Sequence, residues 1–259
     1  MFFVIKSNLA PMYEKPDEYS QRVDEVLHGM AASVLEDKGN WLRVRTAYRY
    51  VGWIHRRHLA PKRHGGDYPV YINAPAADVL TSPKVQAPIL LCLPMGSIVY
   101  KIQPVTKHNR LDWTAIILAD GSTGYVRSAF LSSFPRVVSR EAIIETAKKY
   151  LGTQYRWGGK TTLGIDCSGL CFMAYWLNGI AIYRDAHIKS GFPIKQISPQ
   201  AARKGDLLFF PGHVGMILDE DTMIHSSEAN NGVEIEALTN DWRAKITAAG
   251  GFNEIFSPV

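Results

Sequence analysis

Residues 164–177 read Gly-Ile-Asp-Cys-Ser-Gly-Leu-Cys-Phe-Met-Ala-Tyr-Trp-Leu, and this stretch decides the fold of the second half of the chain. Asp166 is a residue type that begins helices, and Asn178-Gly179 is a pair that ends them. The stretch therefore predicts a helix over 167–177. Its apolar side chains recur every three or four residues, which places one face in the core and holds Cys167 at the helix end.

Cys167 is the candidate nucleophile of this segment. Unpaired amide groups at a helix N-terminus favour an anion, so we expect the pKa of this thiol to be lowered. Of the three cysteines, Cys167 alone has this position; Cys92, in an apolar run, and Cys171, one turn further along the helix, are expected to be core residues. An odd cysteine count does not suggest a disulfide framework. The alternative for Cys167 is a buried packing residue.

A nucleophilic cysteine needs a base, and the base needs a third group to orient it. Two histidines, His213 and His225, lie in successive predicted strands separated by Asp219-Glu220-Asp221. A three-residue loop pairs Leu218 with Thr222 and leaves the two histidines diagonal on one face, where they can meet. A two-residue loop would place them on opposite faces, so the prediction of base and orienter depends on the register.

From Ser139 onward, a helical residue pattern followed by strand patterns indicates an α+β domain. Ser139 can cap a helix over 140–151, which Gly152 would end. Four strands are then predicted, each bounded by Gly, Pro, Asn or Asp residues. They cover residues 206–210, 213–218, 222–227 and 233–238.

The first half of the chain contains a repeat. In both copies a Gly-aromatic-aliphatic triplet, Gly52-Trp53-Ile54 or Gly124-Tyr125-Val126, precedes a closing leucine by the same spacing. Each copy alternates β-branched and aromatic residues in short runs, which predicts a small β-barrel. The longer second copy is explained by a loop at 106–109. Linkers at 61–67 and 132–135 divide the chain into predicted domains 1–62, 67–132 and 136–259.

Composition narrows the possible partners. The net charge is +5 and the sequence pI about 9.0, but the charges are scattered, so we predict no nucleic-acid partner. No run approaches 18 apolar residues, so we predict no membrane partner. No secretory signal is visible after Met1, and the expectation is a cytoplasmic protein, or a secreted one if a leader was removed. Ligand spacing predicts no metal site, and no cofactor is expected. The sequence carries no prediction of the oligomeric state.

Several of these segments together resemble the NlpC/P60 cysteine peptidases. The resemblance covers about residues 136–259 and rests on five stretches in order: 152–159 (GTQYRWGG), 166–170 (DCSGL), 205–210 (GDLLFF), 212–215 (GHVG) and 224–227 (IHSS). Gln154 and Ile165 depart from the common proline and phenylalanine. The repeated barrels resemble bacterial SH3 domains. The resemblance implies an α+β fold, a papain-like NlpC/P60 catalytic domain preceded by two small SH3-like β-barrels.

The same resemblance implies roles for single residues. Cys167 would attack the amide that follows γ-D-glutamate, His213 would be the base and His225 its orienter. Tyr155 would place its hydroxyl near the oxyanion, and Asp166 and Ser168 would hold the D-glutamyl group.

The layout of the whole chain is similar to that of the γ-D-glutamyl-L-diamino acid endopeptidases, the dipeptidyl-peptidase VI group. This similarity implies a murein-derived peptide substrate with a free N-terminal L-alanine. The enzyme would release L-Ala-γ-D-Glu from that peptide during cell-wall recycling. Tyr50 and Asp185 match the residues that bind the ammonium group in that group of enzymes. The acid of the first barrel is Asp24 or Glu25, or its position is taken by Gln21. The rival hypotheses are a secreted endopeptidase acting on intact wall and a wall-binding protein without activity.

Overall fold

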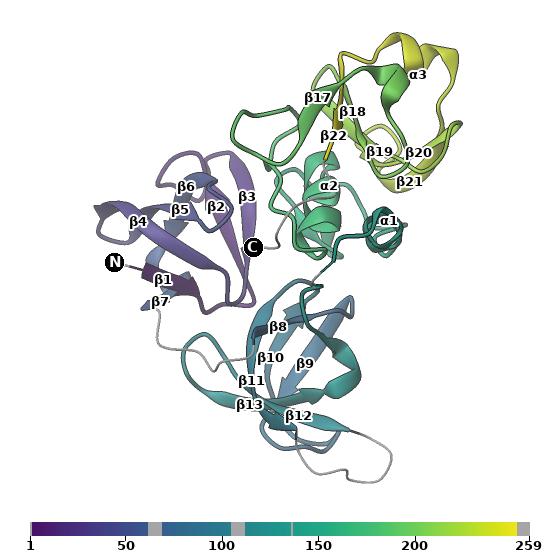
Figure 1. Cartoon of the computed structure of the whole chain (residues 1–259). Helices are drawn as coiled ribbons and strands as arrows, with labels where there is room; N and C mark the ends of the chain where they lie inside the picture. The colour runs from purple at the N-terminus through teal and green to yellow at the C-terminus, as the bar shows by residue number, and fades with distance from the viewer. Residues whose placement is uncertain (1, 62–68, 105–111, 136, 253–259) are drawn as a thin grey trace. The chain divides into compact units, whose positions relative to one another are not determined.

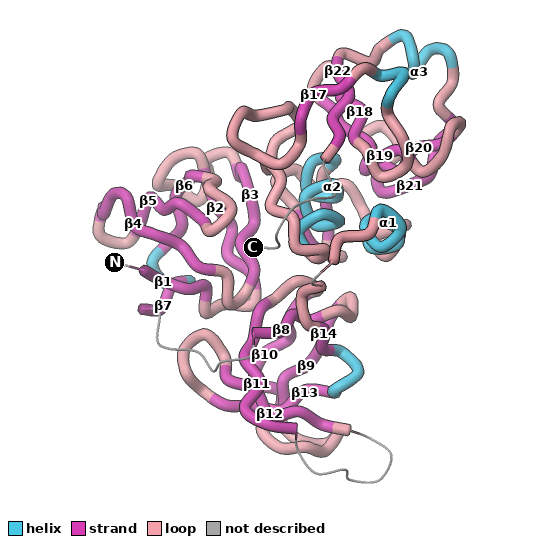
Figure 2. The backbone as a smooth tube through the Cα atoms, in the orientation of Figure 1, coloured by secondary structure: helices cyan, strands magenta, loops and turns pink. Residues whose placement is uncertain are grey.

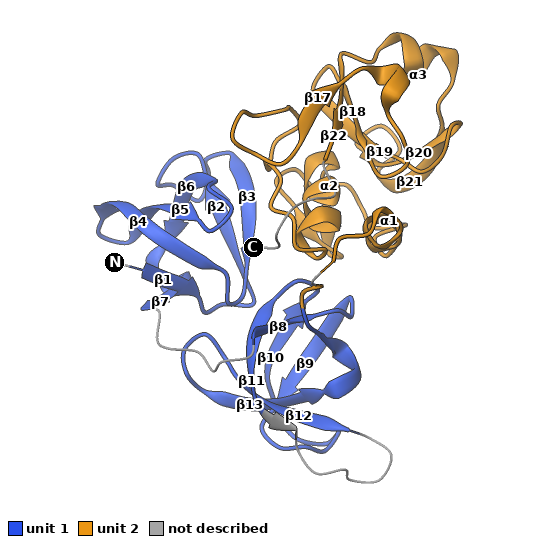
Figure 3. Cartoon of the chain, in the orientation of Figure 1, with its two compact units in different colours: residues 1–133 blue, residues 134–259 orange. Residues whose placement is uncertain are grey.

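The computed structural model describes residues 2–61, 69–104, 112–135 and 137–252. These residues form two compact units, 1–133 and 134–259, which Figure 3 distinguishes by colour. Strands predominate over helices in both (Figure 2). Of the linker predicted at 61–67, residues 62–67 lie outside the described residues, as does the loop predicted at 106–109. None of the described helices is long and apolar enough to cross a membrane.

Unit 1 contains two seven-stranded sheets with equivalent strand orders (Figure 1). The first runs β3-β2-β6-β5-β4-β1-β7 and the second β10-β9-β13-β12-β11-β8-β14. The first sheet consists of β1 (Phe2–Ile5), β2 (Leu9–Tyr13), β3 (Arg22–Leu27), β4 (Ala31–Lys38), β5 (Trp41–Thr46), β6 (Val51–His55) and β7 (Leu59–Pro61). The second consists of β8 (Pro69–Ile72), β9 (Ala76–Leu80), β10 (Ile89–Pro94), β11 (Ile98–Pro104), β12 (Trp113–Ile117), β13 (Thr123–Arg127) and β14 (Leu131–Ser132). Short 3-10 helices, η1 (Arg56–His58) and η2 (Ser128–Phe130), precede the last strand of each sheet.

The repeated glycine of the sequence marks the same close approach in each sheet. A Cβ atom on Gly52 would lie 2.4 Å from the Cγ atom of Met12, and one on Gly124 would lie 2.4 Å from a Cγ atom of Val79. Met12 and Val79 are fully buried side chains of the equivalent strands β2 and β9. The repeat therefore records a packing constraint that recurs in the two sheets.

The prediction that Cys92 is a core residue is wrong. Cys92 is exposed, as are Ile89 and Leu90 in the same strand. Cys92 is paired with Asp78 of β9, which is also exposed, whereas the next pair, Leu93 and Ala77, is buried. Successive side chains of a strand point to opposite faces of the sheet, so Cys92 lies on the solvent face, and an unbroken run of apolar letters did not imply burial.

Unit 2 begins with two helices and ends in a sheet. Helix α1 (Arg140–Lys148) is capped by Ser139, whose hydroxyl accepts a hydrogen bond from the Ala142 amide at 3.3 Å. It ends three residues earlier than predicted, because the amides of residues 149–151 bond three residues back in tight turns. Helix α2 (Cys167–Trp176) begins at the predicted residue and ends one residue early.

The sheet of unit 2 has the order β17-β22-β18-β19-β20-β21. Its strands are β17 (Lys195–Ile197), β18 (Leu207–Phe210), β19 (His213–Ile217), β20 (Thr222–Ser227), β21 (Gly232–Ala237) and β22 (Ala248–Gly251). The smaller elements are β15 (Lys160–Thr161), β16 (Gly164–Ile165), η3 (Pro199–Ala201) and α3 (Asn240–Ala244). The four predicted strands are confirmed to within a residue at each end. Helix α2 packs against β19 and β20 (Figure 1), so the helix and hairpin that carry the predicted site residues are in contact.

Candidate active site

Cys167 occupies the first position of α2, and its side chain is nearly buried. The Asp166 carboxylate caps the helix by accepting a hydrogen bond from the Gly169 amide at 2.6 Å. Leu170, Cys171 and Ala174 are buried, which confirms the core-facing side of the helix. The thiol is therefore held at the end of a rigid element.

The hairpin of β19 and β20 has the register that places His213 and His225 on the same face. Met216 pairs with Ile224, and the Leu218 amide donates to the Thr222 carbonyl at 3.0 Å, so the connecting loop has three residues. The ring nitrogens His213 Nε2 and His225 Nδ1 are 2.8 Å apart. The predicted base and its orienter are therefore joined.

The thiol of Cys167 lies beside the strand that carries His213. The backbone amide of Val214, the residue after His213, hydrogen-bonds the sulfur, as does the amide of Ser168. Both contacts favour the thiolate and lower the pKa. The structure thus brings the candidate nucleophile to the start of β19, which carries the candidate base.

The expectation of a lowered thiol pKa is wrong for the free protein. Burial, followed by the charge of Asp166, raises the pKa of Cys167 to about 11, and the two amides offset only part of this rise. Burial, followed by the neighbouring His225, lowers the pKa of His213 to about 4. Desolvation penalises each charge alone, so the resting pair is a neutral thiol and a neutral imidazole.

Tyr155 lies close to the reacting atoms. Burial, then the charges of Cys167 and Asp166, raise the pKa of its hydroxyl above the usual value for tyrosine. Its backbone is held by a bridge to Ile165, one residue before the helix cap. A tyrosine that stays protonated can donate a hydrogen bond to negative charge formed beside the sulfur.

Asp166 and Ser168 flank the nucleophile and share a partner that sequence reasoning missed, Arg184. The guanidinium of Arg184 donates to both carboxylate oxygens of Asp166, at 3.0 and 2.9 Å, and to the Ser168 hydroxyl at 2.8 Å. Asp166 also accepts from the Gly158 amide at 2.8 Å. These internal donors hold the carboxylate in place at the helix end.

A pocket opens beside the nucleophile within unit 2. Ser168 and Val214 line it on the side of Cys167, and Asp185 lies in its wall together with Lys189 and Phe192. Asp185 is half-buried. The pocket therefore offers an acidic group and an apolar wall to a small ligand.

The remaining predicted residues belong to unit 1 and are described with it. Tyr50 is half-buried and directly precedes β6, and its amide donates to the Thr46 hydroxyl at 3.0 Å. Of the acids considered with it, Asp24 and Glu25 are both buried in β3. Gln21 is exposed just before that strand.

Comparison with known proteins decides the family. The NlpC/P60 family profile matches residues 152–250, and the profile described as bacterial dipeptidyl-peptidase Sh3 domain matches residues 12–59. Dipeptidyl-peptidase 6 of Lysinibacillus sphaericus is 41% identical over 272 residues, covering 95% of this chain and 98% of that protein. The chain belongs to the NlpC/P60 family.

Two further similarities extend along the NlpC/P60 chain. A gamma-D-glutamyl-L-lysine dipeptidyl-peptidase of Bacillus cereus is 27% identical, covering 83% of this chain and 70% of the relative. A solved NlpC/P60 family protein from Bacillus cereus superposes with a TM-score of 0.82 over 97% of this chain and 99% of its own, at 21% identity. The solved structure therefore shares the fold. The chain is an NlpC/P60 domain with an N-terminal bacterial SH3 domain.

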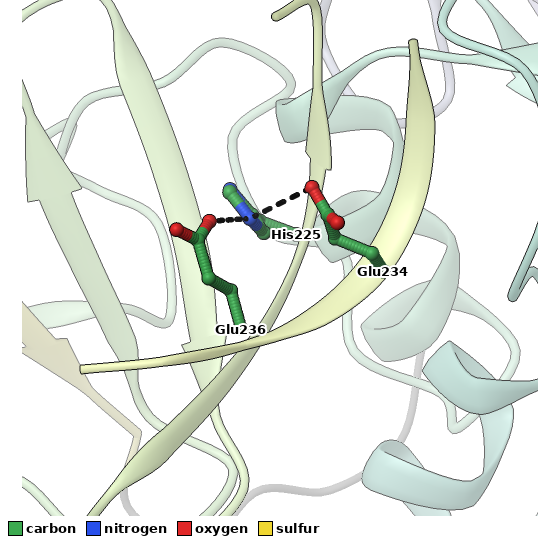
Figure 4. A group of neighbouring side chains, drawn as sticks. All are labelled: His225, Glu234 and Glu236. Atoms are coloured by element: carbon green, nitrogen blue, oxygen red, sulfur yellow. Dashed lines mark ion pairs between the residues drawn. The ribbon is translucent and has the colours of Figure 1, made fainter. Parts of the chain in front are cut away.

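The NlpC/P60 site includes a second group that sequence reasoning missed. His225 Nε2 lies 2.9 Å from Glu236 Oε2 and 3.8 Å from Glu234 Oε1 (Figure 4). Among the described residues this is the group of side chains that could hold a metal ion, with ligand atoms within 4.8 Å of one another. A signal was present in the alternation of Glu234 and Glu236 along β21, which places both on one face opposite His225.

Proposed function

We propose that this protein is a cysteine peptidase that hydrolyses the bond between γ-D-glutamate and a diamino acid in murein peptides. The observation that carries the proposal is the joined pair His213 and His225 beside Cys167. It occurs in a chain related over nearly its whole length to a dipeptidyl-peptidase 6. An intact nucleophile, base and orienter argue against a binding protein without activity.

The resting protonation states define the chemical steps. His213 takes the Cys167 proton as sulfur attacks the carbonyl carbon, and the oxygen that becomes negative receives a hydrogen bond from Tyr155. Protonated His213 then gives its proton to the departing amine, which leaves an acyl-enzyme. A water molecule, deprotonated by His213, attacks the thioester and releases the acid and the thiol.

Two parts of the substrate, the D-glutamyl group and the N-terminal ammonium, can be assigned to residues of complementary chemistry. Ser168 and Asp166 would hold the D-glutamyl group next to the sulfur, and Asp185 would bind the ammonium of a free N-terminal L-alanine in the adjoining pocket. These assignments are supported by the pocket wall formed by Ser168 and Asp185.

The finer domain description is part of the proposal. The second seven-stranded sheet of unit 1 would be a second SH3-like barrel, supported by its equivalent strand order. The catalytic domain would be an α+β papain-like domain over 136–259, behind barrels at 1–62 and 67–132. We also propose a cytoplasmic role in recycling murein peptides, with neither nucleic acid nor membrane as partner.

The test is mass spectrometry of the products formed from L-Ala-γ-D-Glu-L-Lys and from its diaminopimelate counterpart. Release of L-Ala-γ-D-Glu by the wild type, absent in Cys167→Ala, is the expected result. Cleavage of intact peptidoglycan at a comparable rate would instead identify an endopeptidase of the wall. Failure to cleave either peptide or wall would contradict the proposal.

A further inference from the structure

The Nε2 atom of His225, the ring nitrogen that His213 does not contact, faces a carboxylate. His225 is fully buried, and its Nδ1 atom is engaged by His213, so Nε2 must find its partner inside the protein. Figure 4 shows the ring pointing between Glu236 and Glu234 of β21. Nε2 lies 2.9 Å from Glu236 Oε2.

The 2.9 Å contact is short but bent. Neither His225 Nε2 nor Glu236 Oε2 has a well-aligned hydrogen-bond partner among the described residues, although both atoms are buried. Catalytic hydrogen bonds are often poorly aligned in a free enzyme and tighten when substrate binds. A small rotation of either side chain would align the N–H with the carboxylate.

Only one tautomer of His225 suits the reaction. When His213 takes the thiol proton, both of its ring nitrogens carry hydrogen, so Nε2 must donate to His225 Nδ1. His225 Nδ1 must then be bare, and the hydrogen of a neutral His225 ring must be on Nε2. The opposite tautomer would set two N–H groups against each other when His213 becomes charged.

We propose that Glu236 is a positioning residue that holds His225 in the tautomer with hydrogen on Nε2, and so keeps His213 able to accept the thiol proton. This inference rests on the proposed function of the same site. Glu236 acts through His225 and touches no reacting atom. Its negative charge also lies where it stabilises the positive charge that forms on the histidine pair.

Trp242 fixes the Glu236 carboxylate in this position. The indole Nε1 donates to Glu236 Oε1 at 2.9 Å, which leaves Oε2 directed at the histidine. The same indole packs against both imidazole rings, with centroids 6.0 Å from His213 and 5.6 Å from His225. The Trp242 side chain thus covers the histidine pair and orients the acid that faces it.

Glu234 provides a matched control on the same strand. Its Oε1 atom accepts a hydrogen bond from the Asn230 amide group and lies 3.8 Å from His225 Nε2, beyond hydrogen-bond reach. Among the described residues, the titratable groups facing His225 are therefore His213, Glu234 and Glu236. Replacing Glu234 removes a charge near the ring but not the contact with Nε2.

The experiment compares Glu236→Gln, Glu236→Ala and Glu236→Asp with Glu234→Gln in the full chain. For L-Ala-γ-D-Glu-L-Lys we expect kcat to fall roughly tenfold or more in Glu236→Gln and Glu236→Ala, with KM little changed, partial recovery in Glu236→Asp, and about twofold change at most in Glu234→Gln. The imidazole ¹H–¹⁵N correlations of His225 should show hydrogen on Nε2 in the wild type and in Glu234→Gln. They should show a mixture of tautomers in Glu236→Ala.

Three outcomes would overturn the inference. They are unchanged kcat in both Glu236→Gln and Glu236→Ala, equal losses in the Glu234 and Glu236 variants, and an unaltered His225 tautomer. Loss of wild-type activity in EDTA, restored by Zn²⁺, would also overturn it, because the three side chains would then be metal ligands. The tautomer is read without substrate, so it is decided even if the proposed reaction fails.

Discussion

At the scale of single residues, the two buried cysteines of α2 differ in what surrounds them. Cys167 receives backbone amides, one of them from Val214 next to His213, whereas Cys171 is enclosed by the core, where burial raises its pKa well above the usual value. One is placed for chemistry and the other for packing.

Substitution of these two cysteines should separate activity from stability. Cys167→Ala should reduce kcat/KM by about a thousandfold or more, since the nucleophile is lost, with little change in unfolding free energy. Cys171→Ala should lower the unfolding free energy by roughly 1 kcal/mol and keep activity within a few fold. Peptide hydrolysis and urea unfolding of both variants measure this. Activity of Cys167→Ala within tenfold of wild type would rule out the assigned nucleophile.

The neutral resting pair makes a prediction about pH. A Cys167 pKa raised to about 11 means that the thiolate is a small minority at neutral pH, and it increases as pH rises. The rate of alkylation by iodoacetamide should therefore climb steadily between about pH 7 and 10. A preformed thiolate–imidazolium pair would keep the thiol ionised already at acidic pH, so its alkylation rate would be level across the neutral range. A level profile from pH 5 to 9 would therefore contradict the neutral pair.

At the scale of secondary-structure elements, the catalytic unit depends on buried links between segments distant in the chain. Arg140 at the start of α1 donates to Asp206, just before β18, at 2.7 Å, and to the carbonyl oxygen of Phe252 at 3.2 Å. Both charged side chains are almost fully buried. The pair joins the first helix to the central sheet.

Breaking this buried pair should cost stability. Asp206→Ala leaves the Arg140 charge buried without its carboxylate, and we expect the unfolding free energy to fall by about 3 to 5 kcal/mol. Glu141→Gln is the control, because Glu141 pairs with Lys204 at the surface and its loss should change little. Urea unfolding of the two variants gives the comparison. Equal losses of unfolding free energy in the two variants would mean that burial does not make the Arg140–Asp206 pair more important for stability than a surface pair.

At the scale of the whole molecule, the question is which peptides reach Cys167. An enzyme of intact wall must admit long chains, whereas a recycling enzyme can require a free amine at the end of a short peptide. The acidic side chain of Asp185 in the pocket wall fits the second case.

The free-amine requirement predicts a steep substrate preference. Removing one partner of a desolvated charge contact costs about 2 to 5 kcal/mol, so N-acetylated L-Ala-γ-D-Glu-L-Lys should react at least roughly thirtyfold more slowly than the free peptide. Asp185→Asn should narrow this ratio by slowing the free peptide. The measurement is kcat/KM for both peptides in the wild type and in Asp185→Asn. Equal rates in the wild type would indicate an open cleft.

Much of this protein was determined by short-range patterns in the sequence. The Asp166 cap, the helix behind Cys167 and the predicted strands follow from local chemistry, which acts between residues close in the chain. The paired glycines of unit 1 were visible as a repeat, but the close approaches to Met12 and Val79 that explain them join residues distant in the chain. The histidine register also follows from a loop of three residues, although the sequence left a two-residue alternative open. The interpretation of Cys92 was wrong because an unbroken apolar run does not show which face of a strand is exposed to solvent.

Only the tertiary structure decided the environments of the reacting groups. The pKa of Cys167 is raised because the helix end is deeply buried and because Asp166 is negatively charged. The position of a residue at a helix N-terminus can be predicted from the sequence, but the depth of its burial cannot. Arg184 and Trp242 reach the site from segments whose patterns carry no mark of it, and the alternation of Glu234 and Glu236 did not by itself show which carboxylate meets His225 Nε2. Their roles arise from contacts between residues far apart in the chain, and such contacts are properties of the folded packing.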